Sequence, residues 1–161
     1  MSRIASTSCI SNRSGYHSFQ CLSLLLLLWA AVFAAHAQIS DAKVEALVEA
    51  LRLAAPNAGP DAELYSDWKI KPDNIVRWSK RCLDQDVTPE QFVADQSLAR
   101  QVLACVMGKV LRDQFTLSNN NEIVAVQRAA AWWMTGDPDQ YHSSSTSGYT
   151  LRVLEAYLRF F

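Results

Sequence analysis

The stretch QSLARQVLACVMGKVLRDQF, residues 96–115, decides the fold class of this chain of 161 residues. Its apolar side chains recur at helical spacing and cover well over half of the helical wheel, which is typical of a helix that neighbours contact from several sides. Asp95 stands where the N-cap of such a helix is expected. Because Ala104 and Gly108 are small and four residues apart, we also expect a neighbouring backbone to approach closely there. The sequence therefore predicts one long central helix.

Shorter helices are predicted on both sides of this central segment. Capping residues, early prolines and apolar residues at helical spacing indicate where each begins and ends. They comprise a helix from Asp41 to a stop before Pro56, one from Pro72 to about Asp84, a short one after Thr88, one over 122–134 and one over 150–161. No segment shows the sustained alternation of β-branched residues that is typical of strands.

The apolar positions of the last two helices predict which faces point inward. Over 122–134 the predicted inward residues are Ile123, Val126, Ala130 and Trp133. Over 150–161 they are Leu151, Leu154, Tyr157, Leu158 and Phe161. The expected fold class is thus all-α, a compact single-domain bundle of about five helices with one disulfide, preceded by a signal peptide.

The N-terminal segment has the pattern of a secretory signal peptide. Arg3 and Arg13 precede an apolar run over 22–35, and the small residues Ala35 and Ala37 stand three and one positions before a cut at Gln38. We therefore expect a signal peptide over 1–37 and a helical domain over 38–161, exported and either secreted or periplasmic. The alternative is an uncleaved membrane anchor, although 14 apolar residues reach about 21 Å, short of the roughly 30 Å hydrocarbon core. A membrane is expected as a partner only if the leader is not cleaved.

Two cysteines remain after the predicted cut, Cys82 and Cys105. Because an exported chain meets an oxidising compartment, a disulfide between them is expected, and two separately buried thiols are the alternative. Neither cysteine belongs to the close CxxC or HxxxH spacing of zinc sites, so no metal is expected, and the sequence predicts no cofactor.

Trp132 and the turn that follows it form the first candidate site. Trp132 lies off the predicted apolar face of its helix, so it is either a stacking platform for a sugar or a partner, or a residue that the C-terminal helix or a loop covers. Asp137, Asp139, Tyr141 and His142 follow it closely and gather two carboxylates, a phenol and an imidazole. The alternative for these four is ordinary turn chemistry after a helix.

A basic patch is the second candidate site. Arg77, Lys80 and Arg81 share one face of the helix that begins at Pro72, and Lys69 and Lys71 precede that helix. Such a patch can meet an anionic surface, or it can be a solvated helix face. Without the leader, 13 basic residues stand against 16 acidic ones, a net charge of −3, which argues against a nucleic-acid partner. No glycine-rich phosphate loop is present, which argues against a nucleotide.

Two functions remain open at this point. The first is an exported non-enzymatic helical domain that binds or supports another macromolecule, a protein or a glycan. The alternative is a small helical hydrolase that acts on an extracellular polymer such as a glycan through paired carboxylates, with Glu63, Asp67, Asp137 and Asp139 as candidates near aromatic residues. A cleft with two carboxyl groups roughly 5–10 Å apart would favour the hydrolase.

Overall fold

Six α-helices and one 3-10 helix form the framework of residues 38–57, 59 and 62–161, the part of the chain that the computed structural model describes. The predicted signal peptide over 1–37 lies outside these residues. The elements are α2 (Asp41–Leu53), α3 (Pro72–Leu83), α4 (Pro89–Ala94), α5 (Gln96–Leu117), α6 (Glu122–Thr135), η3 (Pro138–His142) and α7 (Ser147–Leu158). Since no strand occurs in the described part, the all-α prediction is confirmed, with six α-helices where about five were expected.

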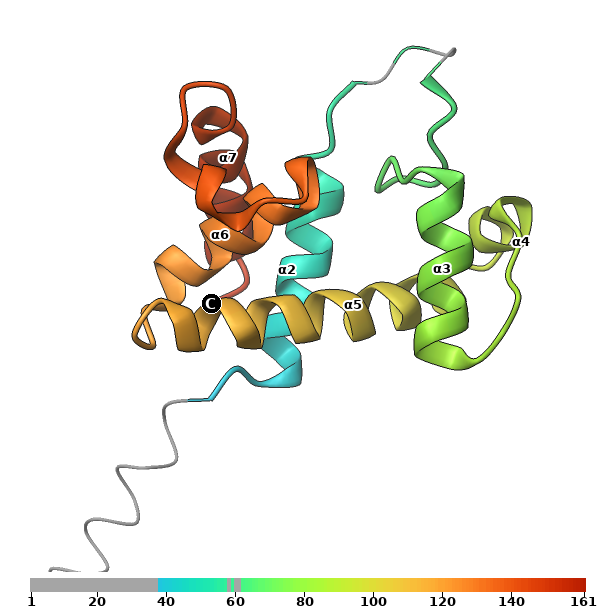
Figure 1. The fold of residues 1–161 in the computed structure, drawn as a ribbon, viewed down its shortest axis with the longest axis horizontal. Coiled ribbons are helices and arrows are strands. Elements are labelled where there is room, and N and C mark those ends of the chain that lie inside the picture. Colours follow the sequence, from blue (N-terminus) through green and yellow to red (C-terminus); the bar gives the residue numbers. More distant parts are fainter. Residues whose placement is uncertain (1–37, 58, 60–61) are drawn as a thin grey trace, which may run out of the picture. The chain divides into compact units, whose positions relative to one another are not determined.

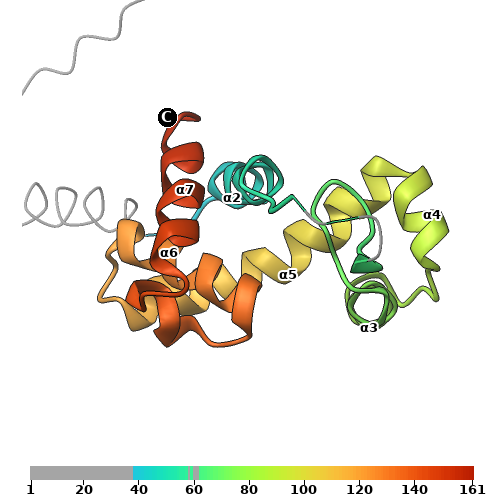
Figure 2. The ribbon, with the colours of Figure 1, turned by 90° about the horizontal axis from the view of Figure 1, so that it is seen from above.

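The predicted central helix is confirmed as α5, which joins two groups of helices (Figures 1 and 2). The α3 lobe, which consists of α3 and α4, packs on the part of α5 nearer its N-terminus. The α6 lobe consists of α2, α6, η3 and α7, in which α7 contacts α2, α6 and η3, and α5 contacts α2 and α6. The chain passes from one lobe to the other through the segment after α2 and again along α5.

Side-chain caps set the starts of four of the six α-helices. The side chains of Ser40, Asp95 and Asn121 accept hydrogen bonds from the first turns of α2, α5 and α6. Thr88 and Gln91 form a reciprocal capping box at the start of α4, which satisfies two backbone N–H groups. These starts agree with the sequence-based prediction because an N-cap depends on residues that are close neighbours in the chain.

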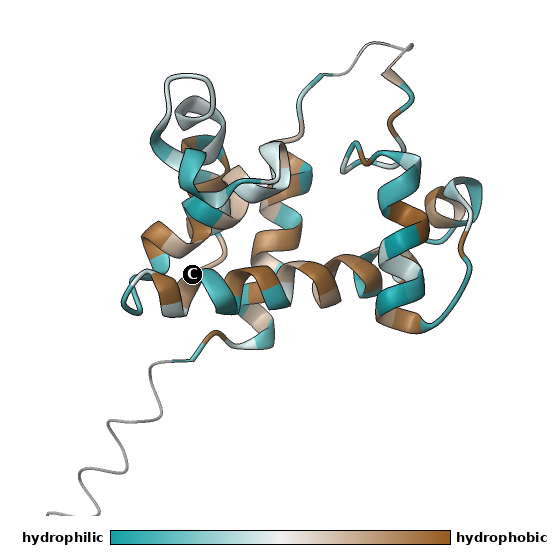
Figure 3. Cartoon of the chain, in the orientation of Figure 1, coloured by the Kyte–Doolittle hydropathy of each residue, from teal (hydrophilic) through white to brown (hydrophobic). Residues whose placement is uncertain are grey.

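The core lies along α5, where Figure 3 shows apolar segments over much of the helix. Six of its side chains are at most 1% exposed, namely Ala99, Val102, Leu103, Val106, Met107 and Leu111. The expected close approach of a backbone at Gly108 is wrong, because the nearest atoms to a Cβ placed there belong to the side chains of Arg112, at 2.8 Å, and Val44, at 3.5 Å. The space beside Gly108 is therefore filled by side chains and not by a neighbouring main chain.

The disulfide between Cys82 and Cys105 is confirmed. Its Cα atoms are 6.1 Å apart, and it joins α3 to α5. A disulfide is consistent with an oxidising location outside the cytosol. Within the described residues, no helix is both long enough and apolar enough to cross a membrane.

The predicted inward face of the last helix is partly wrong. Leu151 and Leu158 are each 49% exposed and Phe161 is 69% exposed, whereas Val153 and Ala156 are buried. The helix also begins at Ser147, three residues earlier than expected. Leu154, which is partly buried, and Tyr157, which is buried, do pack against the core as predicted.

Hydrogen bonds to other elements set the rotation of α7. The Thr150 hydroxyl donates to the backbone oxygen of Tyr141 over 2.8 Å, which fixes the start of α7 against η3. The Tyr157 hydroxyl donates to Glu122 at the start of α6 over 2.6 Å. These bonds turn the smaller residues of α7 toward α2 and α6 and leave a second apolar row outside. On α6 the prediction fails similarly for Ile123, which is 42% exposed.

Candidate functional site

A cleft of about 440 Å³ is lined by the C-terminal end of α6, the first turns of α3 and the segment before α3. We call it the tryptophan cleft, because four tryptophans contribute to it. Its lining comprises Pro56, Leu64, Trp68, Lys69, Ile70, Lys71, Asn74, Arg77, Trp78, Trp132, Trp133, Met134, Thr135 and Gly136. The two ends of the lining come from different lobes, so the fold of the whole domain creates the site.

Three indole rings form the aromatic wall of the tryptophan cleft. Trp78 of α3 is 6% exposed, and its ring centroid lies 6.3 Å from that of Trp132 and 5.6 Å from that of Trp133. The interplanar angles are 28° and 36°, which leaves the rings inclined rather than edge-on. Trp132 and Trp133 are partly exposed. The wall therefore offers apolar ring surface to a ligand while it also holds α3 against α6.

The fourth tryptophan, Trp68, lies on a tight turn. Tyr65 and Ile70 close this turn through two backbone hydrogen bonds of 2.8 and 2.9 Å. Ser66 and Lys69 have φ values of 61° and 55°, a left-handed conformation that costs free energy for residues other than glycine. The closed turn directs Trp68 into the core, where it is 2% exposed, and leaves Lys69 exposed at the cleft.

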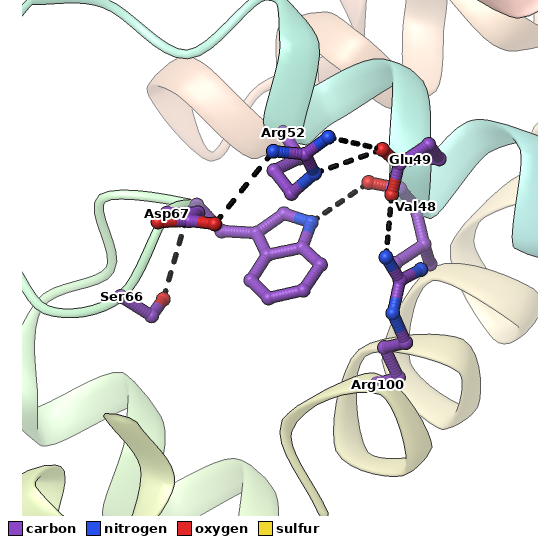
Figure 4. A network of polar contacts seen from close by, with 7 residues as sticks. Val48, Glu49, Arg52, Ser66, Asp67 and Arg100 are labelled. Carbon is purple, nitrogen blue, oxygen red and sulfur yellow. Dashed lines mark hydrogen bonds and ion pairs between the residues drawn. The ribbon is translucent and has the colours of Figure 1, made fainter. Parts of the chain in front are cut away.

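A polar network fixes Trp68 against α2 and α5 (Figure 4). The indole N–H donates to the backbone oxygen of Val48 over 2.8 Å, and the guanidinium of Arg100 lies 5.4 Å from the centroid of the indole ring. Glu49 accepts hydrogen bonds from Arg52, at 2.5 and 2.8 Å, and from Arg100, at 2.7 Å. These bonds, that of Arg52 foremost, hold the pKa of Glu49 below its ordinary value despite partial burial. The network connects this wall of the cleft to α2 and α5.

The polar side chains at the tryptophan cleft are mainly cationic. Lys69, Lys71 and Arg77 are exposed and line it, and Arg77 donates to the amide oxygen of Asn74 over 2.6 Å. None of these three cations is within ion-pair distance of a carboxylate among the described residues. Since the described lining also holds no aspartate or glutamate, the side chains that line the cleft carry a net positive charge.

Trp132 lies in the tryptophan cleft, and its aromatic contact comes from Trp78 of α3. The sequence pointed to the C-terminal helix as the element that would cover it. That expectation missed Trp78, because the meeting of α3 and α6 is a tertiary contact between residues 54 positions apart. The available signal was indirect: Trp78 shares a helix face with Cys82, whose disulfide fixes α3 on α5.

The four polar residues predicted after Trp132 lie outside the lining of the cleft. Asp137 caps η3 by accepting from the backbone N–H of Asp139 over 2.9 Å, and Asp139 forms a 2.7 Å ion pair with Arg128. Arg128 also lies 5.8 Å from the centre of the Tyr141 ring, which contacts His142 edge to face at 4.5 Å. These contacts suffice to explain the group as the stabilisation of a turn.

The predicted basic patch divides between two environments. Arg77 lines the tryptophan cleft together with Lys69 and Lys71, whereas Lys80 and Arg81 do not. Lys80 lies 3.0 Å from Asp84 and 3.6 Å from Asp86, and so is neutralised by acids at the end of α3. The cations of the cleft are therefore those at the first turns of α3 and just before it.

The carboxylates considered for hydrolysis are placed elsewhere. Neither Glu63 nor Asp67 lines the tryptophan cleft, and Asp67 lies 3.6 Å from Arg52. Among the described residues, no group of three metal-ligating side chains is close enough to hold a metal ion.

No protein-family model, curated protein or solved structure matches the chain. The chemistry of the site must therefore be judged from its own residues. Indole faces and cationic donors can hold a ligand by stacking, charge and hydrogen bonds. Acid–base hydrolysis by two carboxyl groups needs side chains that the described lining of this cleft does not contain.

Proposed function

We propose that this chain is an exported, non-enzymatic binding domain that holds a segment of another macromolecule in the tryptophan cleft. The observation that carries the proposal is the composition of the cleft: four tryptophans and three cations unpaired with any described carboxylate. Tryptophan and arginine are the residues that contribute most often to binding energy at interfaces. A concave surface with apolar walls and a few polar groups is also the usual form of a ligand site.

The carboxylates outside the tryptophan cleft also favour a binding function over a hydrolase. Glu45 and Glu49 line a separate hollow beside α2, together with Phe160 and Phe161, which is an aromatic setting for two acids. A general acid needs a raised pKa, whereas the two arginines that contact Glu49 lower the pKa of that group. Glu49 is thus held as a structural anion and is poorly suited to donate a proton.

Export through a cleaved leader is part of the proposal. The sequence pattern over 1–37 and the disulfide between Cys82 and Cys105 both support it. Mass spectrometry of the protein that accumulates outside the cytosol should find Gln38, in its open or cyclised form, at the N-terminus. A full-length chain that stays in the membrane fraction would contradict export with cleavage.

Ligand binding is tested with protein expressed from the full-length coding sequence and purified in the form in which the cells accumulate it. A panel of polysaccharides and peptides is titrated while tryptophan fluorescence is recorded, and the products are then examined for shortened chains. We expect at least one polymer to change the fluorescence and to be recovered intact.

The tryptophan variants identify the site. In Trp132→Ala and Trp133→Ala, with folding checked by circular dichroism, affinity should fall at least about tenfold, the loss typical of a binding hot spot. Phe161→Ala is the matched control, because Phe161 is an exposed aromatic residue outside the cleft. Undiminished affinity in both tryptophan variants, or cleavage of the bound polymer by the unaltered protein, would overturn the proposal.

A further inference from the structure

We infer that the tryptophan cleft selects an acidic glycan, a chain of sugar rings that carry carboxylate or sulfate groups. The inference rests on the proposed binding function and names the chemical class of the ligand. Three features carry it: the sign of the charge at the cleft, the partly exposed indole faces, and the balance of hydrogen-bond donors and acceptors in the lining.

The charge at the cleft is opposite to that of the domain. Residues 38–161 carry 13 basic against 16 acidic side chains, yet the cleft is lined by Lys69, Lys71 and Arg77 and by no described carboxylate. A cationic site on an anionic domain raises the local concentration of anions while the rest of the surface repels them. The ligand segment that fits this cleft is therefore acidic.

The indole faces supply the second feature. Trp132 and Trp133 are partly exposed on adjacent positions of α6, and both rest on the buried ring of Trp78. The C–H groups on the flat face of a sugar ring stack on an aromatic face, where apolar contact needs no hydrogen-bond partner. Because both rings contact the buried ring of Trp78, their positions are restrained before a ligand arrives, which lowers the entropic cost of binding.

The donor–acceptor balance distinguishes a glycan from an acidic peptide. Lysine and arginine only donate, and the oxygens of the lining polar side chains already accept hydrogen bonds: that of Asn74 accepts from Arg77, and the hydroxyl oxygen of Thr135 accepts from the backbone N–H of Asp137. A peptide brings a backbone N–H at most residues, and each one buried without an acceptor costs about 1–3 kcal/mol. Carboxylates and sulfates are acceptors only, and a sugar hydroxyl, which can donate and accept, can rotate its hydrogen toward water while its oxygen accepts from the cleft, a freedom that a backbone N–H does not have.

The experiment compares two forms of one polymer. Oligogalacturonate, an acidic glycan, and the same oligomer after reduction of its carboxyl groups to neutral hydroxymethyl groups are titrated against the purified protein, at low and at high salt. A decamer of glutamate provides an acidic ligand with a peptide backbone. Heparin oligosaccharides test whether sulfate replaces carboxylate.

The matched variants have equal changes of net charge. The cleft variant carries Lys69→Gln, Lys71→Gln and Arg77→Gln, and the control variant carries Lys109→Gln, Arg112→Gln and Arg159→Gln, three exposed cations that do not line the cleft. We expect the acidic glycan to bind, the cleft variant to bind it at least about tenfold more weakly, and the control variant to change by less than about threefold. Salt should weaken binding to the unaltered protein and have less effect on the cleft variant.

Four outcomes overturn the inference, and they affect the proposed function differently. Equal binding of the neutral oligomer, or an unchanged cleft variant, removes the acidic glycan but leaves a binding domain. Binding of the glutamate decamer without binding of either acidic glycan does the same and points to a protein partner. If no ligand of either panel changes the tryptophan fluorescence, both the inference and the binding function fail.

Discussion

Removing the hydroxyl of Tyr157 should destabilise the domain, because that hydroxyl belongs to a contact that ties three helices together. Tyr157 of α7 is 1% exposed and donates to one oxygen of Glu122, at the start of α6, over 2.6 Å. The other oxygen of Glu122 lies 2.5 Å from the ammonium group of Lys43 on α2. Tyr157→Phe removes one of these two contacts and leaves the ring in place.

The size of the effect follows from the burial of the partners. A hydrogen bond to a charged group contributes about 1.5–3 kcal/mol, and we expect the lower end because the side chain of Glu122 is 28% exposed. Tyr157→Phe should therefore lower the free energy of unfolding by about 1.5 kcal/mol, or the midpoint of thermal unfolding by roughly 5 °C. Glu122→Gln keeps an acceptor for the hydroxyl but loses the ion pair with Lys43 and a negative charge in the first turn of α6, so it should cost about 1–2 kcal/mol.

Acid titration tests whether Glu122 stabilises the domain through its negative charge or through the packing of its side chain. Burial acts to raise the pKa of Glu122, but the hydrogen bonds from Lys43 and Tyr157 outweigh it, and the net pKa is lowered. A lowered pKa means that the stabilisation is complete above the ordinary value of about 4.3 and is lost as the pH falls through the folded value. The stability difference between the unaltered protein and Glu122→Gln should thus be constant near neutral pH and shrink below about pH 4.

Urea unfolding followed by circular dichroism measures each of these differences. Glu155→Gln is the control, because it removes an equal charge from an exposed site on α7 and should change stability by less than about 0.5 kcal/mol. The reasoning would be refuted if the free energy of unfolding of Tyr157→Phe lay within about 0.3 kcal/mol of that of the unaltered protein. It would also be refuted if the stability difference caused by Glu122→Gln stayed unchanged at acid pH.

Three further changes test the fold. Reduction of the Cys82–Cys105 bond should lower the free energy of unfolding by about 3 kcal/mol, the chain-entropy value for a loop of this size, as urea unfolding with and without reductant will show. Gly108→Ala should be neutral or stabilising by up to about 1 kcal/mol in thermal unfolding, because the closest neighbour of the new Cβ is the far end of the flexible Arg112 side chain. A loss of stability above about 1 kcal/mol would mean that the Arg112 side chain cannot move away from the new Cβ. Trp68→Phe removes the buried hydrogen bond from the indole to the backbone oxygen of Val48 and should cost about 0.5–1.5 kcal/mol by urea unfolding, and an unchanged midpoint would contradict this.

The features that sequence predicts well are those that neighbouring residues determine. The capping box at Thr88 and the apolar wheel of residues 96–115 depend only on local spacing, and both occur in the structure. The bond between Cys82 and Cys105 was predictable for another reason, because after the expected cut only one pairing was possible.

The rotation of α7 shows why other features were not predictable. Leu151, Leu158 and Phe161 have helical spacing, but so do the buried Val153 and Ala156, so hydropathy supports two faces. The choice between them is made by hydrogen bonds to other elements, from Thr150 to Tyr141 of η3 and from Tyr157 to Glu122 of α6, and the periodicity of α7 itself does not contain these partners. The same limit applies to the cleft, whose walls meet only after α3 and α6 have packed on α5.

The disulfide connects the stability of the domain with the geometry of its cleft. Cys82 follows Trp78 by four residues, one turn of α3, so fixing Cys82 on α5 also limits where the ring of Trp78 can lie. The α3 lobe is otherwise held by packing on α5, by the indoles of Trp132 and Trp133, and by the chain segment that carries Trp68. A ligand bound in the cleft as proposed would contact both lobes and add to the same restraint. Reduction should therefore weaken ligand binding even under conditions where the domain stays folded, because the aromatic wall would no longer be held in place before the ligand arrives.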